Sequence, residues 1–130
     1  MKRVAVLVGC AALLLGRCEA ADEHTKDTLD MVKVSLKDEK AILVDVREPK
    51  EWEAGHLKDA VLVPLSKLNG SEADAAIKEL PKDKVIYLHC ARGSRCLKAA
   101  RILKDQGYDA RPLAAGYEAL LKEGFPKADK

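Results

Sequence analysis

The residues most able to do covalent chemistry lie in one short segment, where Cys90 directly follows an apolar run. The loop after this cysteine consists of Ala91, Arg92, Gly93, Ser94 and Arg95. Backbone N–H groups of a tight loop and of the helix after it, together with two arginine side chains, would surround the sulfur with positive charge. Such surroundings lower the pKa of a cysteine from its usual value of about 8.5. The segment therefore predicts a nucleophilic thiolate rather than a buried, inert cysteine.

The segments on either side of this loop place it at one end of a sheet. Val85–Leu88 is a continuous apolar run, typical of a strand buried on both faces. Cys96–Gln106 has helical periodicity and ends before Gly107. Open α/β sheets bind ligands at the carboxyl ends of their strands. We therefore expect Cys90 at that end of the sheet, beside the first turn of a helix.

Strands and helices alternate along the rest of the chain. Further strands are expected at Ala41–Val44, Val61–Val63 and Ala110–Leu113. Further helices are expected at 29–36 with Thr25 or Thr28 as N-cap, at Lys50–Ala54, from Ser71 through Leu80, and at Tyr117–Lys122. This alternation predicts an α/β domain with a mostly parallel sheet and helices packed against it.

Residues 1–20 have the features of a cleaved secretory signal peptide. Lys2 and Arg3 precede an apolar stretch at 4–16, and the segment ends at Ala20, after which we expect cleavage. The apolar stretch is shorter than the roughly 20 residues of a membrane-spanning helix, so no stable membrane anchor is expected. The alternative is a lipoprotein modified at Cys10. The expected location is the periplasm or the exterior of the cell.

Composition and charge exclude several classes of protein. The chain has 130 residues, of which 48% are hydrophobic, and this indicates one folded domain rather than a disordered or multidomain protein. Removing Lys2, Arg3, Arg17 and Glu19 with the signal peptide from the 23 basic and 21 acidic residues leaves equal numbers of the two. A neutral mature chain gives no electrostatic reason to expect nucleic-acid binding.

Signal-peptide cleavage would remove Cys10 and Cys18 and leave only Cys90 and Cys96. Two cysteines in one short segment are not a disulfide framework. Together with the three histidines they show none of the paired spacings of a structural zinc site. We expect no metal and no cofactor.

Two sets of motifs resemble rhodanese domains. The first is Leu43-Val44-Asp45-Val46-Arg47-Glu48-Pro49, followed by Glu51-Trp52, Gly55-His56-Leu57 and Val63-Pro64. The second is His89-Cys90-Ala91-Arg92-Gly93-Ser94-Arg95, which is similar to the rhodanese active-site loop. The resemblance spans about Thr28 to Leu121. It implies a single rhodanese domain in residues 21–130, with its core at about 28–123 and a five-stranded, mostly parallel sheet flanked by helices on both faces.

The resemblance also implies an activity, that of a sulfurtransferase carrying sulfur as a persulfide on Cys90. The thiolate would take sulfane sulfur from thiosulfate or a similar small-molecule donor and pass it to cyanide or a thiol acceptor. The loop N–H groups, Arg92 and Arg95 would stabilise the anionic donor and the persulfide. We expect a monomer with no nucleic-acid partner.

Four residues outside the loop are candidates for a supporting role. Asp45 and Arg47 follow the first buried strand, and their expected role is an ion pair that fixes a turn. His56 follows a turn glycine and is expected as a hydrogen-bonded structural histidine. Cys96 lies on the apolar face of its helix and is expected as a small buried residue. Its alternative role is that of a redox partner that forms a reversible disulfide with Cys90.

The length of the loop separates sulfur transfer from phosphoryl transfer. Phosphatases of related architecture have an arginine six positions after the cysteine, where this chain has Cys96. Arg95 closes a loop one residue shorter, which suits a single sulfur atom and argues equally against an arsenate reductase. The alternatives to a sulfurtransferase are a thiol-disulfide or redox-sensing protein using Cys90 and Cys96, and a non-catalytic rhodanese-like binding module.

The chain departs from the rhodanese pattern at a few positions. Asp59 and Ala115 stand where glycine is usual, Cys96 stands where serine or threonine is common, and Leu120 replaces a frequent aromatic residue. None of these changes the nucleophile. We expect altered local turn geometry at Asp59 and Ala115.

Overall fold

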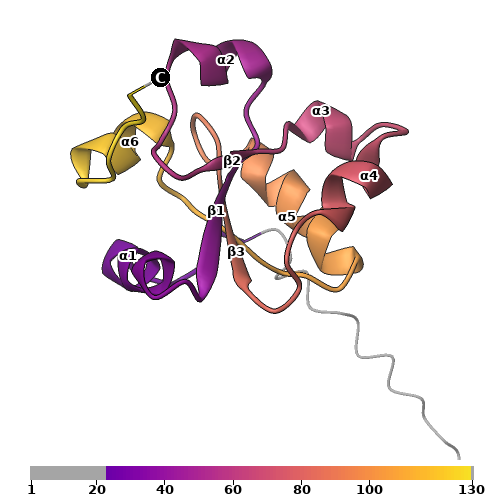
Figure 1. Cartoon of the computed structure of the whole chain (residues 1–130), viewed down its shortest axis with the longest axis horizontal. Helices are drawn as coiled ribbons and strands as arrows, with labels where there is room; N and C mark the ends of the chain where they lie inside the picture. The colour runs from indigo at the N-terminus through magenta and orange to yellow at the C-terminus, as the bar shows by residue number, and fades with distance from the viewer. Residues whose placement is uncertain (1–22, 130) are drawn as a thin grey trace, which may run out of the picture.

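The computed structural model describes residues 23–129, which form a four-stranded parallel sheet covered by helices (Figure 1). The strands are β1 (Ala41–Asp45), β2 (Val61–Leu62), β3 (Val85–His89) and β4 (Asp109–Pro112). The helices are α1 (Leu29–Lys37), α2 (Pro49–Ala54), α3 (Leu65–Leu68), α4 (Ala73–Lys78), α5 (Arg95–Asp105) and α6 (Tyr117–Lys122). The strand order is β2-β1-β3-β4, so β1 and β3 are central. The predicted α/β class with a parallel sheet is confirmed.

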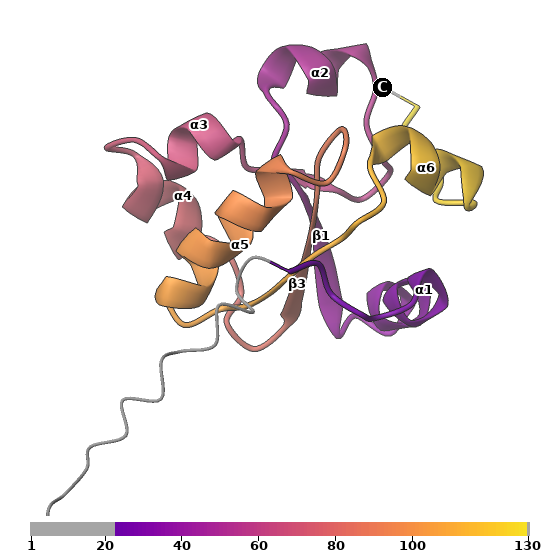
Figure 2. The ribbon, with the colours of Figure 1, turned by 180° about the vertical axis from the view of Figure 1, so that it is seen from behind.

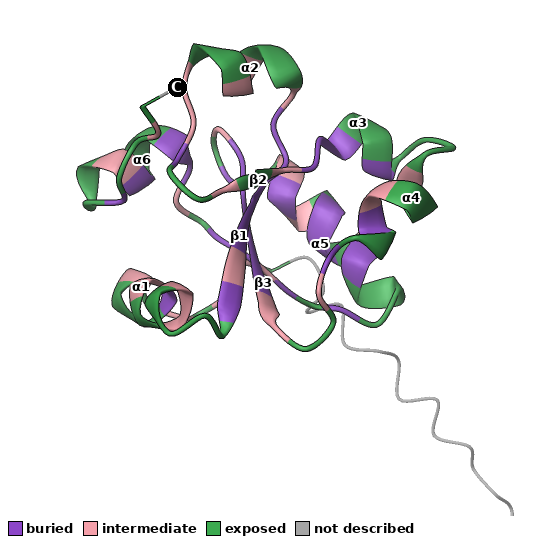
Figure 3. Cartoon of the chain, in the orientation of Figure 1, coloured by how far each residue is buried: buried purple, intermediate pink, exposed green. Residues whose placement is uncertain are grey.

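Helices cover both faces of the sheet, as expected. α1 and α6 lie on one side, and α3, α4 and α5 lie on the other (Figures 1 and 2). Alternate strand residues face the two sides: Leu43 and Tyr87 pack in the cluster with α1 and α6, whereas Val44 and Leu88 pack in the cluster with α5. Figure 3 shows the buried residues concentrated along the central strands and the inner side of α5.

The two central strands end together at the edge where the chemistry was predicted. β1 and β3 are in register along their whole length, from Ala41 opposite Val85 to Asp45 opposite His89. Because the strands are parallel, their carboxyl ends share one edge, and Cys90 is the next residue after β3. α2 lies beyond this edge of the sheet (Figure 1).

Most helix boundaries follow the predicted signals. Thr28 caps α1, its hydroxyl accepting a hydrogen bond from the backbone N–H of Met31 at 3.2 Å. Pro49 is the first residue of α2, and Gly55 follows its last residue. α6 has the predicted bounds, and α5 begins one residue earlier than predicted, at Arg95.

The predicted start of α4 at Ser71 is wrong. The backbone N–H of Ala73 donates to the carbonyl oxygen of Gly70 at 3.2 Å, so the chain makes a turn here and the helix begins at Ala73. The sequence analysis also did not predict α3. This helix has only four residues, of which Leu65 and Leu68 are buried, and one turn is too short to show a periodic pattern.

The expected fifth strand is absent from residues 23–129, where the sheet has four. At the β4 edge, the backbone N–H of Thr25 donates to the carbonyl oxygen of Pro112 at 2.8 Å. The segment before α1 therefore runs beside β4 but does not form a ladder with it. Proline has no N–H with which to continue such a ladder, which is one physical reason for the difference.

The predicted signal peptide, with Cys10 and Cys18, lies outside the described residues, so cleavage and location stay predictions. Within residues 23–129, no helix combines the length and the apolar character needed to cross a membrane.

Candidate active site

Cys90 lies at the carboxyl end of β3 with its side chain fully buried. The backbone N–H of Gly93 donates to its sulfur at 3.0 Å. The pKa of Cys90 falls to about 5, chiefly because the Cys96 side chain hydrogen-bonds to the thiolate and also because the N–H groups of Cys96, Arg92 and Gly93 point at it. Burial opposes this shift but does not cancel it. The predicted direction, towards thiolate, therefore agrees with the site's geometry.

Cys96 lies in the first turn of α5 and is fully buried, as the apolar-face argument predicted. It is more than a small apolar residue, because its thiol donates to the carbonyl oxygens of Gly93 at 3.1 Å and Leu113 at 3.4 Å. Its pKa is raised by its hydrogen bond to Cys90 and by burial. Both cysteines are free thiols in this structure. The single proton of the Cys96 thiol is thus shared between these two carbonyl oxygens and the Cys90 thiolate beside it.

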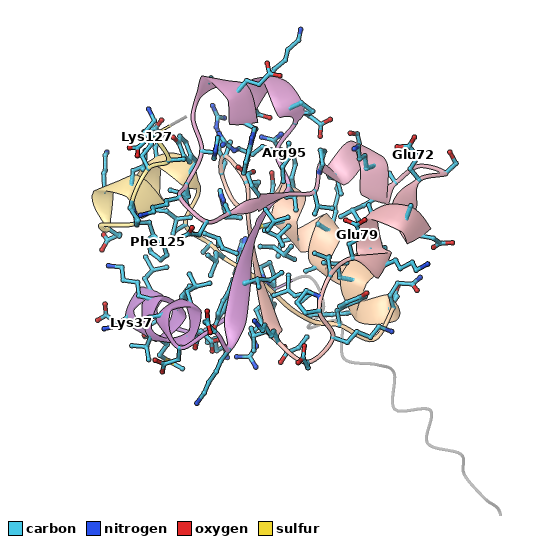
Figure 4. The ribbon with its side chains drawn as sticks, viewed as in Figure 1. Lys37, Glu72, Glu79, Arg95, Phe125 and Lys127 are labelled. Atoms are coloured by element: carbon cyan, nitrogen blue, oxygen red, sulfur yellow. The ribbon has the colours of Figure 1, made fainter. Side chains whose placement is uncertain are left out.

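The two loop arginines have different surroundings. Arg95 makes a bidentate ion pair with Glu51 of α2, at 2.5 and 2.8 Å, and lies between α5 and α2 in Figure 4. Hydrogen bonds from Arg95 lower the pKa of Glu51 to about 2. Arg92 is exposed and has no side-chain partner within residues 23–129. Arg92 is therefore free to meet an anionic substrate, whereas part of the Arg95 charge is offset by Glu51.

Asp45 and Arg47 form the expected ion pair at the end of β1, and both are buried. The Arg47 guanidinium donates to both carboxylate oxygens of Asp45 at 2.8–3.0 Å and to the carbonyl oxygen of Gly55 at 2.8 Å. The Arg47 backbone N–H also donates to Asp45 at 2.9 Å. The guanidinium lies 4.2 Å from the ring centre of Tyr117. The pair thus joins the end of β1, the turn after α2 and α6.

Two histidines flank this region and have structural surroundings. His56 has Nδ1 at 2.9 Å from the carbonyl oxygen of Trp52 and stacks on the Trp52 ring at 3.6 Å, which agrees with the expected structural role. His89 is fully buried at the end of β3, 3.8 Å from Asp45, and its pKa is lowered mainly by burial. Neither ring nitrogen of His89 has a hydrogen-bond partner among residues 23–129. His89 is therefore a neutral ring near neutral pH.

Two contacts to the loop have no counterpart in the sequence analysis. Nε2 of His24 lies 2.7 Å from the carbonyl oxygen of Gly93, although the two residues are 69 positions apart. The backbone N–H of Tyr117 donates to the carbonyl oxygen of Cys90 at 2.9 Å. No local sequence signal predicts the first contact. The resemblance to rhodanese domains also extends over Leu113 through Gly116-Tyr117, and the glycine there is the sequence sign of the second contact.

The described residues offer limited space and no metal site. A cavity of about 350 Å³ between α2 and α6 is bordered by Arg47, Glu51 and Tyr117. A larger one of about 660 Å³ lies between α1 and the C-terminal segment, near Phe125. Since the side chain of Cys90 has no exposed surface, a substrate reaches its sulfur only when the surrounding groups shift. Within residues 23–129, no three His, Cys, Asp or Glu side chains are grouped to hold a metal ion.

Comparisons with known proteins match this fold and site. Residues 28–123 match the rhodanese-like domain family. A sulfurtransferase of Allochromatium vinosum is 32% identical over 89 residues, which cover 68% of this chain and 78% of that protein. The probable adenylyltransferase/sulfurtransferase MoeZ of Mycobacterium tuberculosis is 36% identical over 88 residues, which are 67% of this chain and 22% of MoeZ.

Solved structures show the same architecture. The BH2092 protein of Bacillus halodurans superposes with a TM-score of 0.68 at 28% identity, covering 81% of this chain and 76% of that one. The human single-domain sulfurtransferase TSTD1 gives a TM-score of 0.62 at 27% identity, covering 73% of this chain and 93% of that one. A buried cysteine in an N–H-lined loop at the carboxyl end of a parallel sheet can hold its sulfur as an anion. The chain belongs to the rhodanese-like domain family, and it spans only about a fifth of the length of MoeZ.

Proposed function

We propose that this protein is a sulfurtransferase that moves sulfane sulfur from thiosulfate, or a similar anionic donor, to cyanide or a thiol through a persulfide on Cys90. The observation that carries the proposal is the 3.0 Å hydrogen bond from the Gly93 N–H to the Cys90 sulfur. The lowered pKa of Cys90, about 5, supports it, because the sulfur is then a thiolate near neutral pH.

The reaction has two half-reactions that balance. The Cys90 thiolate attacks the outer sulfur of thiosulfate, a new S–S bond forms, and the S–S bond of thiosulfate breaks so that sulfite leaves with the electron pair. Cyanide then attacks the outer sulfur of the persulfide, thiocyanate is released, and the electron pair returns to Cys90 as thiolate. Parallel lines in double-reciprocal plots are the kinetic signature of such a ping-pong reaction.

The loop supplies the electrostatic stabilisation. Its backbone N–H groups already point at a sulfur anion, and a persulfide is also an anion. The unpartnered Arg92 is the proposed contact for the negatively charged donor. Arg95, held by Glu51, fixes α2 over the edge of the sheet and adds a weaker field.

The test measures thiocyanate release and persulfide formation separately. The full-length chain is incubated with thiosulfate and cyanide, and intact mass is measured with thiosulfate alone. We expect thiocyanate turnover and one added sulfur on Cys90, both lost in Cys90→Ala and both kept in the matched control Cys96→Ser. A chain that gains no sulfur and releases no thiocyanate would contradict the proposal. A rate of aryl phosphate hydrolysis higher than the rate of sulfur transfer would also contradict it.

We also propose that residues 1–20 are removed during export. Intact mass of the protein recovered from the periplasm or medium tests this directly. A mature chain that begins at Ala21 is expected. A chain that keeps Met1, or one that carries a lipid, would overturn the proposal.

A further inference from the structure

The segment 23–28 lies against the loop that holds Cys90. Nε2 of His24 is 2.7 Å from the carbonyl oxygen of Gly93. A carbonyl oxygen can only accept a hydrogen bond, so the ring carries a proton on Nε2 and donates it. The approach is close on both sides, because a Cβ at Gly93 would lie 3.1 Å from this nitrogen and 2.9 Å from the carbonyl oxygen of Ala114.

Other residues of the segment anchor it independently of the histidine. The carboxylate of Asp27 accepts hydrogen bonds from the Tyr87 hydroxyl at 2.7 Å and from the Arg111 guanidinium at 2.8 Å. These two bonds lower the pKa of Asp27, the one from Tyr87 having the larger effect. The backbone N–H of Thr25 bonds to β4. The histidine is thus presented to the loop by a fixed backbone and not by a free tail.

Gly93 links this segment to both cysteines. Its N–H donates to the sulfur of Cys90 at 3.0 Å, and its carbonyl oxygen accepts from the thiol of Cys96 at 3.1 Å. The residue has φ +92°, a left-handed conformation that gives its two peptide groups these directions. The orientation of one residue therefore controls two of the hydrogen bonds around the nucleophile.

The Cys96 thiol has one proton and more than one acceptor. The carbonyl oxygens of Gly93 and Leu113 both compete with the Cys90 thiolate for this proton. An imidazole N–H is a stronger donor than a thiol, so it takes up hydrogen-bonding capacity of the Gly93 oxygen. The proton of Cys96 is then more available to the thiolate.

We propose that His24 is a positioning residue of the active-site loop. Its hydrogen bond to the Gly93 carbonyl oxygen keeps the Gly93 N–H directed at the Cys90 sulfur and favours donation from Cys96 to that sulfur. An effect of His24 on the rate of sulfur transfer rests on the proposed sulfurtransferase function. An effect of His24 on the acidity of Cys90 does not depend on that function.

Other groups also act on Cys90, and these residues are the same in every His24 variant. They are Cys96 and Arg95 at the start of α5, His89 on β3, and Glu51 of α2, which acts through Arg95. His24 contacts none of these side chains in the described hydrogen bonds, and reaches the sulfur only through the Gly93 backbone. A shift caused by a His24 variant therefore reports on the loop.

The experiment measures the alkylation rate of Cys90 by iodoacetamide against pH in the full-length chain, with the site assigned by peptide mass. His24→Ala is compared with His24→Gln, whose amide nitrogen can replace Nε2, and with His24→Asn, whose shorter amide cannot reach. Lys26→Ala, a change at an exposed residue of the same segment, is the matched control. Sulfur transfer, as kcat and KM, is measured in parallel.

We expect His24→Ala and His24→Asn to move the alkylation midpoint up by about one pH unit, so that the rate near pH 5 falls about fivefold. His24→Gln should return most of the rate, and Lys26→Ala should match the parent. An unchanged midpoint in both His24→Ala and His24→Asn overturns the proposal. So does an equal shift in His24→Gln, or a shift in Lys26→Ala. If the parent chain forms no persulfide, the sulfurtransferase function fails, while these midpoints still decide the role of His24.

Discussion

Gly116 and Ala91 pack backbone against backbone. A Cβ at Gly116 would lie 1.9 Å from the carbonyl oxygen of Ala91, which is closer than any non-bonded contact allows. The following N–H, that of Tyr117, donates to the carbonyl oxygen of Cys90 at 2.9 Å. The start of α6 therefore packs directly against the backbone of the loop that holds Cys90, and this close packing requires a glycine at position 116.

Gly116→Ala should displace the loop. Both sides of the contact are backbone, so neither can yield by rotating a side chain, and we expect a stability loss of about 1–3 kcal/mol together with a lower rate of Cys90 alkylation. Gly70→Ala is the control, because its nearest atom would be 3.3 Å away. Urea unfolding and alkylation kinetics check both variants. Equal behaviour of the two would show that the loop does not depend on this contact.

Alkylation of Cys90 should follow the pKa of about 5. A lowered pKa means that the thiolate is present above that pH and is lost as the pH falls through it, so the rate should be flat at neutral pH and half-maximal near pH 5. In concentrated denaturant the same cysteine should titrate at about 8.5, the ordinary value. Rates of iodoacetamide labelling under the two conditions test this. A folded-state midpoint near that of the denatured chain would contradict it.

Variants of Cys96 should separate hydrogen bonding from redox chemistry. Cys96→Ala removes the donor and should raise the Cys90 midpoint, whereas Cys96→Ser keeps an O–H donor and should leave it nearly unchanged. The pKa of Cys96 is raised first by its hydrogen bond to the Cys90 thiolate and then by burial, and burial persists when Cys90 is oxidised, so Cys96 is a poor nucleophile towards it. We therefore expect the parent and Cys96→Ser to lose and regain activity alike under mild oxidant. Formation of an intramolecular disulfide in the parent would instead support the redox-sensing alternative.

Arg47→Met should be strongly destabilising. It leaves the fully buried carboxylate of Asp45 with the backbone N–H of residue 47 but without its guanidinium partner, and breaking a buried pair in this way costs about 3–5 kcal/mol. Arg111→Met is the comparison, since its pairs with Asp109 and with Asp27 are both more exposed and should each contribute only about 1 kcal/mol or less. Urea unfolding at neutral pH measures both. A loss for Arg47→Met no larger than that for Arg111→Met would show that Asp45 is solvated.

Asp59→Gly should stabilise the protein. Asp59 has φ +64°, a left-handed conformation that costs a residue with a side chain about 1–2 kcal/mol, and this outweighs the extra flexibility of glycine in the unfolded chain. We expect a gain of about 0.5–1 kcal/mol. Asp83→Gly, at an exposed turn residue without positive φ, should give no gain. Thermal unfolding of the two variants distinguishes them.

Local patterns predicted most of the fold. The apolar runs at 41–44 and 85–88 are the two central strands. They could be recognised because a strand buried on both faces is apolar along its whole length. The unusual turn geometry expected at Asp59 is present, because this usual glycine position has a positive φ. Ala115, the other usual glycine position, does not have a positive φ. The short α3 was missed because four residues are too few to show a helical period, and the helix start at Ser71 was misplaced because the chain first makes a turn at Gly70.

The site was predicted in its nucleophile and less well in its surroundings. A cysteine, a glycine and two arginines in six residues are a local signal, and Cys90 and its N–H-lined loop follow from it. The partners of that loop come from elsewhere: Glu51 binds Arg95 from 44 positions away, and His24 reaches Gly93 from 69. The charge and size of a residue do not show which distant residue will pair with it, because the fold brings the two together.

The pairing of β1 with β3 makes the reactivity of Cys90 a product of folding. The two strands are separated by the whole of α2, α3 and α4, and parallel strands joined by long connections are slow to pair. Before they pair, the donors around the sulfur are not assembled, and the cysteine has its ordinary acidity. Folding therefore makes two opposite changes at this cysteine, because it turns the thiol into a thiolate near neutral pH and also removes its sulfur from solvent.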